Sequence, residues 1–368
     1  NDLTDYANGA TDFYNDRIEI FASALDFEFR GTHNWLRNVI THEYTHMVTL
    51  QSSMKLPKMM PAIYVQWLNY EKEKRPDVLY GYPNGIVSYP ISGVAVPSWF
   101  AEGVAQYQRQ QLGYEKWDAQ RDMILRSRVV AGDMLSYNEM GQFSTINSLK
   151  AESIYNSGFA LVRYISKTYG EDKLKKLVDH LSDLDNFSMD AAFRSSVGKD
   201  GSDVYKEWKD YLEKDYSKRL SGVKETKIEG DLIQKEDFAN LNPKFSPDGK
   251  WIAFMSNEGT DFFSTQMYLY NTETKTKIPL PFTSGSNFNW SPDSKKIIYA
   301  QKQIPPSLKE ISLFDLYEYD LQQHSVRKMT DNSRYTTPAY SYDGKKIVFL
   351  VPNDGTMNMK IADYNLTN

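Results

Sequence analysis

The sequence predicts a multidomain chain whose first part is α+β and mainly helical, and whose second part is all β. Through residues 34–220, apolar residues recur at helical spacing. After Ser221 and Gly222 the spacing changes to short alternating runs separated by Asn, Pro, Asp and Gly. A motif with a turn at its centre then occurs three times. The predicted domains are therefore residues 1–222 and 223–368.

The first domain is expected to begin with a strand and to continue mainly as helices. Residues 17–23 alternate and contain the β-branched residues Ile18 and Ile20, which is typical of a strand. Residues 77–96 are rich in Tyr, Gly and Pro, and predict a loop or short hairpin. Apolar periodicity predicts six helices, at residues 34–50, 97–112, 114–130, 152–169, 172–184 and 204–220.

The second domain contains three copies of a hairpin motif, at residues 242–254, 288–299 and 338–349. In the first copy, Pro-Asp-Gly supplies a tight turn, because Pro fixes φ and Gly accepts positive φ. The third copy has Tyr342 where Pro is expected. Each copy is followed by an outer strand, at residues 267–270, 316–319 and 359–362.

Four short strands in every 40–50 residues or so are typical of a β-propeller blade. The repeat resembles the TolB-type, WD40-like propeller, whose turn carries Ser-Pro-Asp-Gly-Lys. About two and a half blades are too few to close a ring, since propellers need about four. We therefore expect a partial propeller and a chain that is a piece of a longer protein.

Composition excludes several classes of function. The net charge of −5 comes without a basic block, which argues against nucleic acid as a partner. No run approaches the roughly 20 apolar residues of a transmembrane helix. The absence of cysteine removes disulfides, thiol nucleophiles and Cys-based zinc sites. It fits an exported bacterial protein, although many cytosolic proteins also lack cysteine; a start at Asn1 indicates a removed signal peptide or an excised piece.

The pattern His-Glu-x-x-His occurs in the middle of the helix predicted at residues 34–50, as His42, Glu43 and His46. Two imidazoles four residues apart lie on one helix face, so both can reach one metal ion. Glu43 lies about 100° around the helix from His42 and can point towards a metal-bound water. The uncharged flanks of this pattern predict a buried helix.

A third metal ligand is predicted at Glu102, a carboxylate in the otherwise apolar start of the next helix. Burying an unpaired carboxylate is costly, whereas a bound Zn²⁺ neutralises it. Two histidines and one glutamate with an open fourth position are typical of a catalytic zinc site. One catalytic Zn²⁺ is therefore the expected cofactor.

The His-Glu-x-x-His helix followed by Trp-Phe-x-Glu-Gly-x-Ala resembles the gluzincin metallopeptidases of the peptidase MA-like family, which have a thermolysin-like fold. Further likeness at residues 155–170 and 191–212 extends the resemblance over most of residues 12–220. The resemblance implies that His42, His46 and Glu102 bind zinc. It also implies that Glu43 is the general base and that Tyr155 stabilises the oxyanion.

Two positions depart from the family's pattern. Gln106 stands where many gluzincins have a carboxylate that orients a zinc-bound histidine, and its amide oxygen can accept the same hydrogen bond with less charge. The strand with Ile18, Ile20 and Ala22 lacks the Gly-x-Met-Glu-Asn signature of related aminopeptidases, which favours an endopeptidase. This strand is expected to pair with extended substrate backbone.

Two functions are therefore carried forward. The first is a secreted or periplasmic zinc endopeptidase that cleaves proteins or peptides, with the propeller positioning a protein partner or substrate. The alternative is a catalytically inactive protein of the same fold that binds proteins outside the cytoplasm.

Overall fold

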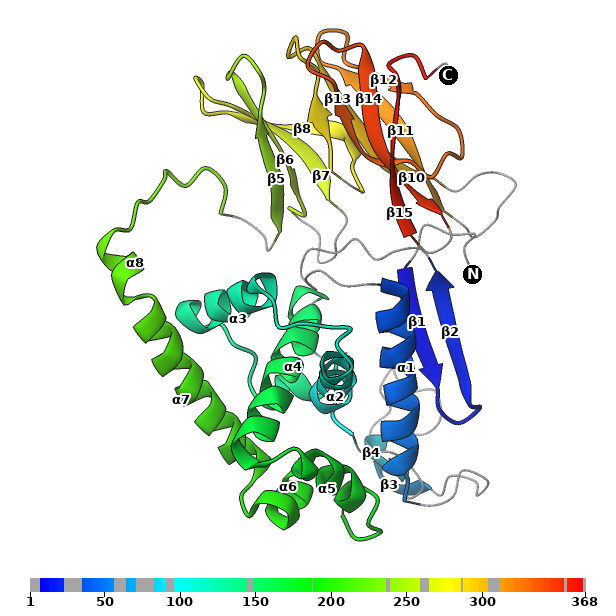
Figure 1. Ribbon diagram of the computed structural model, residues 1–368, viewed down its shortest axis with the longest axis vertical. Coiled ribbons are helices and arrows are strands. Elements are labelled where there is room, and N and C mark those ends of the chain that lie inside the picture. The colour runs from blue at the N-terminus through cyan, green and yellow to red at the C-terminus, as the bar shows by residue number, and fades with distance from the viewer. Residues whose placement is uncertain are drawn as a thin grey trace.

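The computed structural model describes residues 7–22, 35–55, 64–70, 83–90, 96–143, 148–186, 188–235, 239–258, 265–285, 287–303, 312–353 and 356–366. The chain is multidomain: the helices lie together in its N-terminal part, and the C-terminal part consists of β-sheets (Figure 1). Across these ranges, no helix combines the length and the apolar character that crossing a membrane requires.

The N-terminal part contains two separate hairpins and a set of helices. β1 (Ala7–Asp12) pairs antiparallel with β2 (Arg17–Ala22), and β3 (Tyr64–Tyr70) pairs with β4 (Pro83–Pro90). The helices are α1 (Trp35–Ser52), α2 (Ser98–Gln111), α3 (Ala119–Ala131), the 3₁₀ turn η2 (Glu139–Gly141), α4 (Ser148–Tyr169), α5 (Asp172–Leu181), α6 (Met189–Val197), α7 (Gly201–Arg219) and α8 (Ser221–Glu225).

The six helices predicted from periodicity are confirmed as α1, α2, α3, α4, α5 and α7, and the predicted strand is confirmed as β2. The elements that were not predicted are β1, β3, η2, α6 and α8. β1 consists of small and polar residues with little intrinsic preference for a strand, so its pairing with β2 decides its conformation. α6 is short, and its local signals are the N-cap Ser188, which accepts a hydrogen bond from the Ala191 N–H, and Gly198 at its end.

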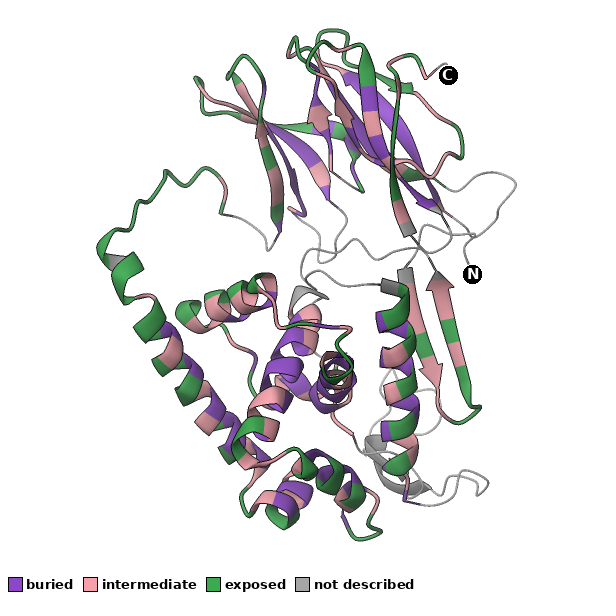
Figure 2. Cartoon of the chain, in the orientation of Figure 1, coloured by how far each residue is buried: buried purple, intermediate pink, exposed green. Residues whose placement is uncertain are grey.

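The helical core is built around the crossing of α2 and α4, whose facing sides are buried (Figure 2). Trp99 and Phe100 of α2 and Phe159 of α4 are almost completely enclosed. At the crossing the two backbones touch: a Cβ on Gly103 would collide with the carbonyl of Gly158, and a Cβ on Gly158 would collide with the carbonyl oxygen of Trp99. The absence of side chains at these two positions sets how closely α2 approaches α4.

The C-terminal part contains three antiparallel sheets that follow one another along the chain. The first two have four strands each, in the orders β5-β6-β7-β8 and β12-β11-β10-β9, and the third has the order β13-β14-β15. The strands are β5 (Asn240–Phe245), β6 (Trp251–Ser256), β7 (Gln266–Asn271), β8 (Lys277–Thr283), β9 (Asn289–Trp290), β10 (Lys296–Gln303), β11 (Leu313–Asp320), β12 (Ser325–Lys328), β13 (Thr336–Tyr340), β14 (Lys346–Asn353) and β15 (Thr356–Asp363). The predicted hairpins and outer strands are thus confirmed.

The repeated turn is held mainly by a serine and an aspartate. In the first sheet, Ser246 Oγ donates to Asp248 Oδ1 at 2.6 Å and accepts from the Trp251 N–H at 3.0 Å. The serine and aspartate of the other two copies make the same 2.6 Å bond. Tyr342 therefore replaces proline without changing the turn, because the side-chain hydrogen bonds do not depend on it.

Along the sequence, the helical part ends and the β part begins near the predicted boundary. α8 ends at Glu225 and β5 begins at Asn240, so the predicted division after residue 222 falls within α8. Residues 226–235 between them have no regular secondary structure, and Ile228 in this segment is 96% exposed.

We predict that Gly158→Ala lowers the melting temperature, because its Cβ would overlap the backbone of α2 and overpacking typically costs about 1–3 kcal/mol. Gly222→Ala is the matched control, since no atom lies within 4 Å of the position its Cβ would take in α8. This control should leave the melting temperature unchanged or raise it slightly. Equal melting temperatures for the wild type and Gly158→Ala would show that the α2–α4 contact tolerates a side chain.

Candidate metal centre

α1 presents both histidines of the His-Glu-x-x-His pattern to α2. His42 and His46 are buried, as are Val39 and Met47 on neighbouring positions of the helix. The opposite face of α1 is exposed at Ile40, Tyr44 and Val48, so the prediction of a wholly buried helix is wrong. α1 is therefore amphipathic: one of its faces packs against α2 and β1, and the opposite face is exposed.

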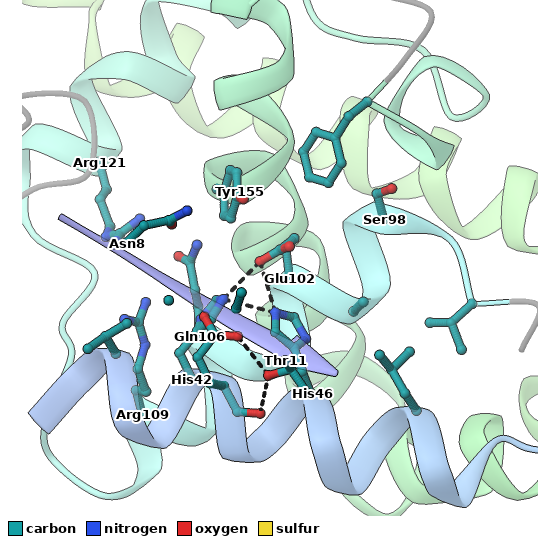
Figure 3. A pocket seen from close by; sticks show the side chains of 18 residues that line it. Asn8, Thr11, His42, His46, Ser98, Glu102, Gln106, Arg109, Arg121 and Tyr155 are labelled. Atoms are coloured by element: carbon teal, nitrogen blue, oxygen red, sulfur yellow. Dashed lines mark hydrogen bonds and ion pairs between the residues drawn. The ribbon is translucent and has the colours of Figure 1, made fainter. Parts of the chain in front are cut away.

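Glu102 completes a three-sided group with the two histidines. Its Oε2 lies 3.0 Å from His42 Nε2 and 3.3 Å from His46 Nε2, and the two Nε2 atoms are 3.0 Å apart (Figure 3). Within the described ranges, these three residues are the one group of histidines and carboxylates with metal-binding proximity.

The triangle of ligand atoms fits a tetrahedral metal ion. Zn–N and Zn–O bonds of about 2.0–2.1 Å place neighbouring ligand atoms of a tetrahedron about 3.3 Å apart. The observed separations of 3.0–3.3 Å match one face of such a tetrahedron. Glu102 Oε2 is also buried and accepts no well-oriented hydrogen bond from the described residues, so a cation at the centre of the triangle would satisfy it.

The electrostatics of the triangle favour a positive charge at its centre. Burial, helped by the charge of His46, lowers the pKa of His42 to about 3. Burial also opposes ionisation of Glu102, but the charge of His46 outweighs it and holds the pKa of Glu102 well below its usual range. Burial acts against a charge on His46 as well, yet Glu102 raises the pKa of His46. His46 and Glu102 therefore each favour the charged form of the other.

Glu43 is held by β1, which lies along α1. Thr11 Oγ1 is 2.7 Å from Glu43 Oε2 and 2.8 Å from the Glu43 carbonyl oxygen, so its single hydrogen serves two acceptors. Gly9 lies directly over the same carboxylate: a Cβ there would be 2.6 Å from Glu43 Oε1. Burial raises the pKa of Glu43. Sequence reasoning missed both residues, because β1 carries no motif.

The site opens into a cavity of about 340 Å³ walled by β1, α1, α2, α3 and α4 (Figure 3). Tyr155 of α4 lies in its wall, where its ring packs 5.6 Å from that of Phe143. Arg109 and Arg121, which no sequence motif marks, also line the cavity. Both are buried and contact the carboxylate of Glu115, at 2.8 and 2.9 Å.

Gln106 lies one turn after Glu102 and is 1% exposed, so it is neither a surface nor a capping residue. Its Oε1 and the Nδ1 of His42 are both buried and have no hydrogen-bond partner among the described residues. These two atoms are complementary, because one can only accept a hydrogen bond and the other can donate one when Nε2 binds a metal.

The residues predicted to contact substrate, Ile18, Ile20 and Ala22, all lie on β2. None of the three is among the described residues that line the cavity, whereas Asn8, Gly9, Ala10 and Thr11 of β1 are. β1 lies between, because it pairs with β2 at one edge and packs on α1. The strand at the cavity wall is therefore β1.

The helical part of the chain is similar to a known protein family. Residues 86–214 match the family model of the Peptidase MA superfamily. The matched range contains Glu102, Gln106 and Tyr155, and it begins after α1. The match supports a Peptidase MA domain in this part of the chain.

The chain is also similar to the Tol-Pal system protein TolB of Francisella tularensis. It is 29% identical over 131 residues to TolB of subspecies mediasiatica (strain FSC147) and of subspecies tularensis (strain SCHU S4 / Schu 4). The matches cover 35% of this chain and 29% and 28% of those relatives. The crystal structure of TolB from Acinetobacter baumannii is 22% identical, with a TM-score of 0.30, over 36% of this chain and 31% of that chain. The chain thus joins a Peptidase MA region to a TolB-like β region.

We predict that the purified protein binds one Zn²⁺ per chain and that Glu102→Gln weakens this binding. Removing a residue that hydrogen-bonds to a metal ligand costs roughly 10–100-fold in metal affinity. Loss of a metal ligand itself should therefore cost at least as much. The measurement is competition with a fluorescent chelator, supported by elemental analysis.

Glu213→Gln, at an exposed position of α7, is the control for charge removal and should retain wild-type affinity. Equal zinc affinity for Glu102→Gln and the wild type would exclude Glu102 as a ligand.

Proposed function

We propose that this protein is a zinc-dependent peptidase that hydrolyses peptide bonds in proteins or peptides, as an endopeptidase outside the cytoplasm. The observation that supports this most is the buried triangle of His42, His46 and Glu102, with spacings of 3.0–3.3 Å, beside the carboxylate of Glu43. The Peptidase MA match supports the reaction class, and the cysteine-free composition supports an exported protein.

His42, His46 and Glu102 would hold the zinc ion. When bound, Zn²⁺ supplies Lewis-acid chemistry: it acidifies water and polarises a carbonyl group. Gln106 would accept a hydrogen bond from Nδ1 of His42 and so keep Nε2 directed at the metal. This hydrogen bond would fix the orientation of the His42 ring, but the Gln106 amide would transfer less charge to the ring than a carboxylate would.

Glu43 would act as the general base and hold the abstracted proton on Oε1, since Thr11 contacts Oε2. The raised pKa of this buried carboxyl group favours proton uptake. Tyr155, in the cavity wall, would donate a hydrogen bond to the oxyanion. The edge of β1 that faces away from β2 would pair with extended substrate backbone in place of β2, because β1 borders the cavity.

The alternative function is protein binding without catalysis, in which the TolB-like β region contacts a protein partner. It is favoured by the similarity to TolB of the Tol-Pal system. Zinc binding without cleavage of any member of a broad peptide library would support this alternative.

We predict that Glu43→Gln removes peptidase activity while zinc binding persists, because Glu43 is not one of the three ligands. A general base contributes about 10²–10⁴-fold to rate, so kcat/KM on casein or a peptide library should fall by that factor. Glu213→Gln should cleave like the wild type. Undiminished cleavage by Glu43→Gln would exclude the mechanism.

We also predict that Thr11→Val lowers kcat by roughly tenfold or more with little change in KM. A hydrogen bond to a charged group is worth about 1.5–3 kcal/mol, and 1.36 kcal/mol corresponds to tenfold in rate. Thr11→Ser keeps the hydroxyl and should restore most of the rate. Equal activity of the Val and Ser variants would show that Thr11 does not position Glu43.

A further inference from the structure

A second cavity of about 780 Å³ lies among α2, α3, α4 and α7, and it shares no lining residue with the metal-site cavity. Its volume is within the range of roughly 300–1,000 Å³ that is common for small-molecule sites. Its walls contain Trp117, Trp208 and several tyrosines. The proposed peptidase function does not use this cavity.

Arg163 of α4 is the central charged group of this cavity. Its guanidinium carbon lies 5.1 Å from the ring centre of Trp117 and 5.7 Å from that of Phe159. It makes neither a hydrogen bond nor an ion pair with the described residues, although a guanidinium carries five N–H donors. The aromatic contacts therefore fix the orientation of the cation and leave its donors available.

The carboxylates that border the cavity are committed to other cations. Asp122 pairs with Arg219 at 2.7 Å and with Arg126 at 2.7 Å, and Asp215 lies 3.3 Å from Arg219. Lys167 follows Arg163 by one helical turn, lines the same cavity and forms no ion pair within the described part of the chain. Arg163 and Lys167 thus give the cavity two adjacent positive charges.

The surface beside these charges is aromatic. Tyr164 and Tyr211 face each other with ring centres 5.5 Å apart, and Tyr107 and Tyr216 also line the cavity. Tyr107 and Tyr216 already use their hydroxyl groups in hydrogen bonds with Ser166 and Asp122. An apolar or aromatic group can therefore pack here without leaving those two hydroxyls unpaired.

We propose that this cavity binds a carboxylate carried on an aromatic or apolar group. Arg163 would hold the carboxylate through two parallel hydrogen bonds, Lys167 would add charge, and the tyrosine wall would cover the apolar body. Such a carboxylate can belong to a free organic acid or chain end, or to an acidic side chain within a peptide. The proposal does not require the metal centre to be active.

The test is isothermal titration calorimetry with three probes. N-acetylphenylalanine carries a free carboxylate, N-acetylphenylalaninamide is its neutral counterpart, and N-acetyl-aspartyl-phenylalaninamide carries the carboxylate on a side chain. We expect saturable binding of one or both acids and at least about tenfold weaker binding of the neutral amide. The acid that binds identifies the source of the carboxylate. Binding of neither acid, or equal binding of the neutral amide, would overturn the proposal.

Variants then locate the site. Arg163→Gln should weaken binding of the acid about 10–100-fold, and Arg163→Lys should be intermediate because it keeps the charge but loses the planar fork. Arg194→Gln on α6, outside the cavity, is the matched control and should bind like the wild type. Unchanged affinity in a folded Arg163→Gln protein would overturn the proposal.

Two further measurements separate this site from the metal centre and from effects on folding. Carboxylates also bind zinc, so the titration is repeated after removal of metal with EDTA, and we expect the same affinity. If removal of the metal abolished binding of the acid, the proposal would be overturned. The proposed peptidase function would be unaffected by that result. If Arg163→Gln does not fold, Lys167→Gln, an exposed change, should still weaken binding by up to about fivefold, and no effect there would count against the site.

Discussion

The close contact between α2 and α4 is the constraint on which the candidate site depends. Gly103 and Gly158 let the two backbones touch, and Glu102 is the residue immediately before Gly103. The packing of α2 against α4 in the helical core therefore sets how far Glu102 reaches towards α1. Because Trp99 and Phe100 anchor the same turn in the core, α2 cannot slide without losing buried apolar surface.

Against this fixed helix, α1 brings two imidazoles and β1 brings a hydroxyl group. Three candidate ligand atoms lie within 3.3 Å of one another in a buried place, and a cation between them would stabilise this arrangement. The carboxylate of Glu43 beside them would be mobile if α1 alone held it, but Thr11 and Gly9 of β1 confine it. The hairpin of β1 and β2 thus contributes to the site although it carries no metal ligand.

The sequence correctly predicted those structural features that neighbouring residues determine. Two histidines four residues apart must share a helix face, and the repeated Ser-x-Asp turns must each close a hairpin, because neighbouring residues alone determine both outcomes. The sequence does not predict features whose deciding contact is distant. β1 has the composition of a loop and becomes a strand only by pairing with β2, so the sequence did not predict that β1 borders the cavity. Arg109 and Arg121 are ordinary helix residues in the sequence, and only folding brings both to Glu115 beside the cavity.

The division into a helical part and a repeated β part, the positions of the main helices, and the candidacy of His42, Glu43, His46 and Glu102 could all be predicted from the sequence. These follow from periodicity, from turn chemistry and from the cost of burying charge. The folded structure was needed to show that the three candidate ligand atoms converge at tetrahedral spacing, that β1 rather than β2 borders the site, and that Gln106 is buried in the same cavity wall as His42. Each of these depends on how far apart two elements pack, and that distance is set by side chains remote in sequence, above all by the two glycines where α2 meets α4.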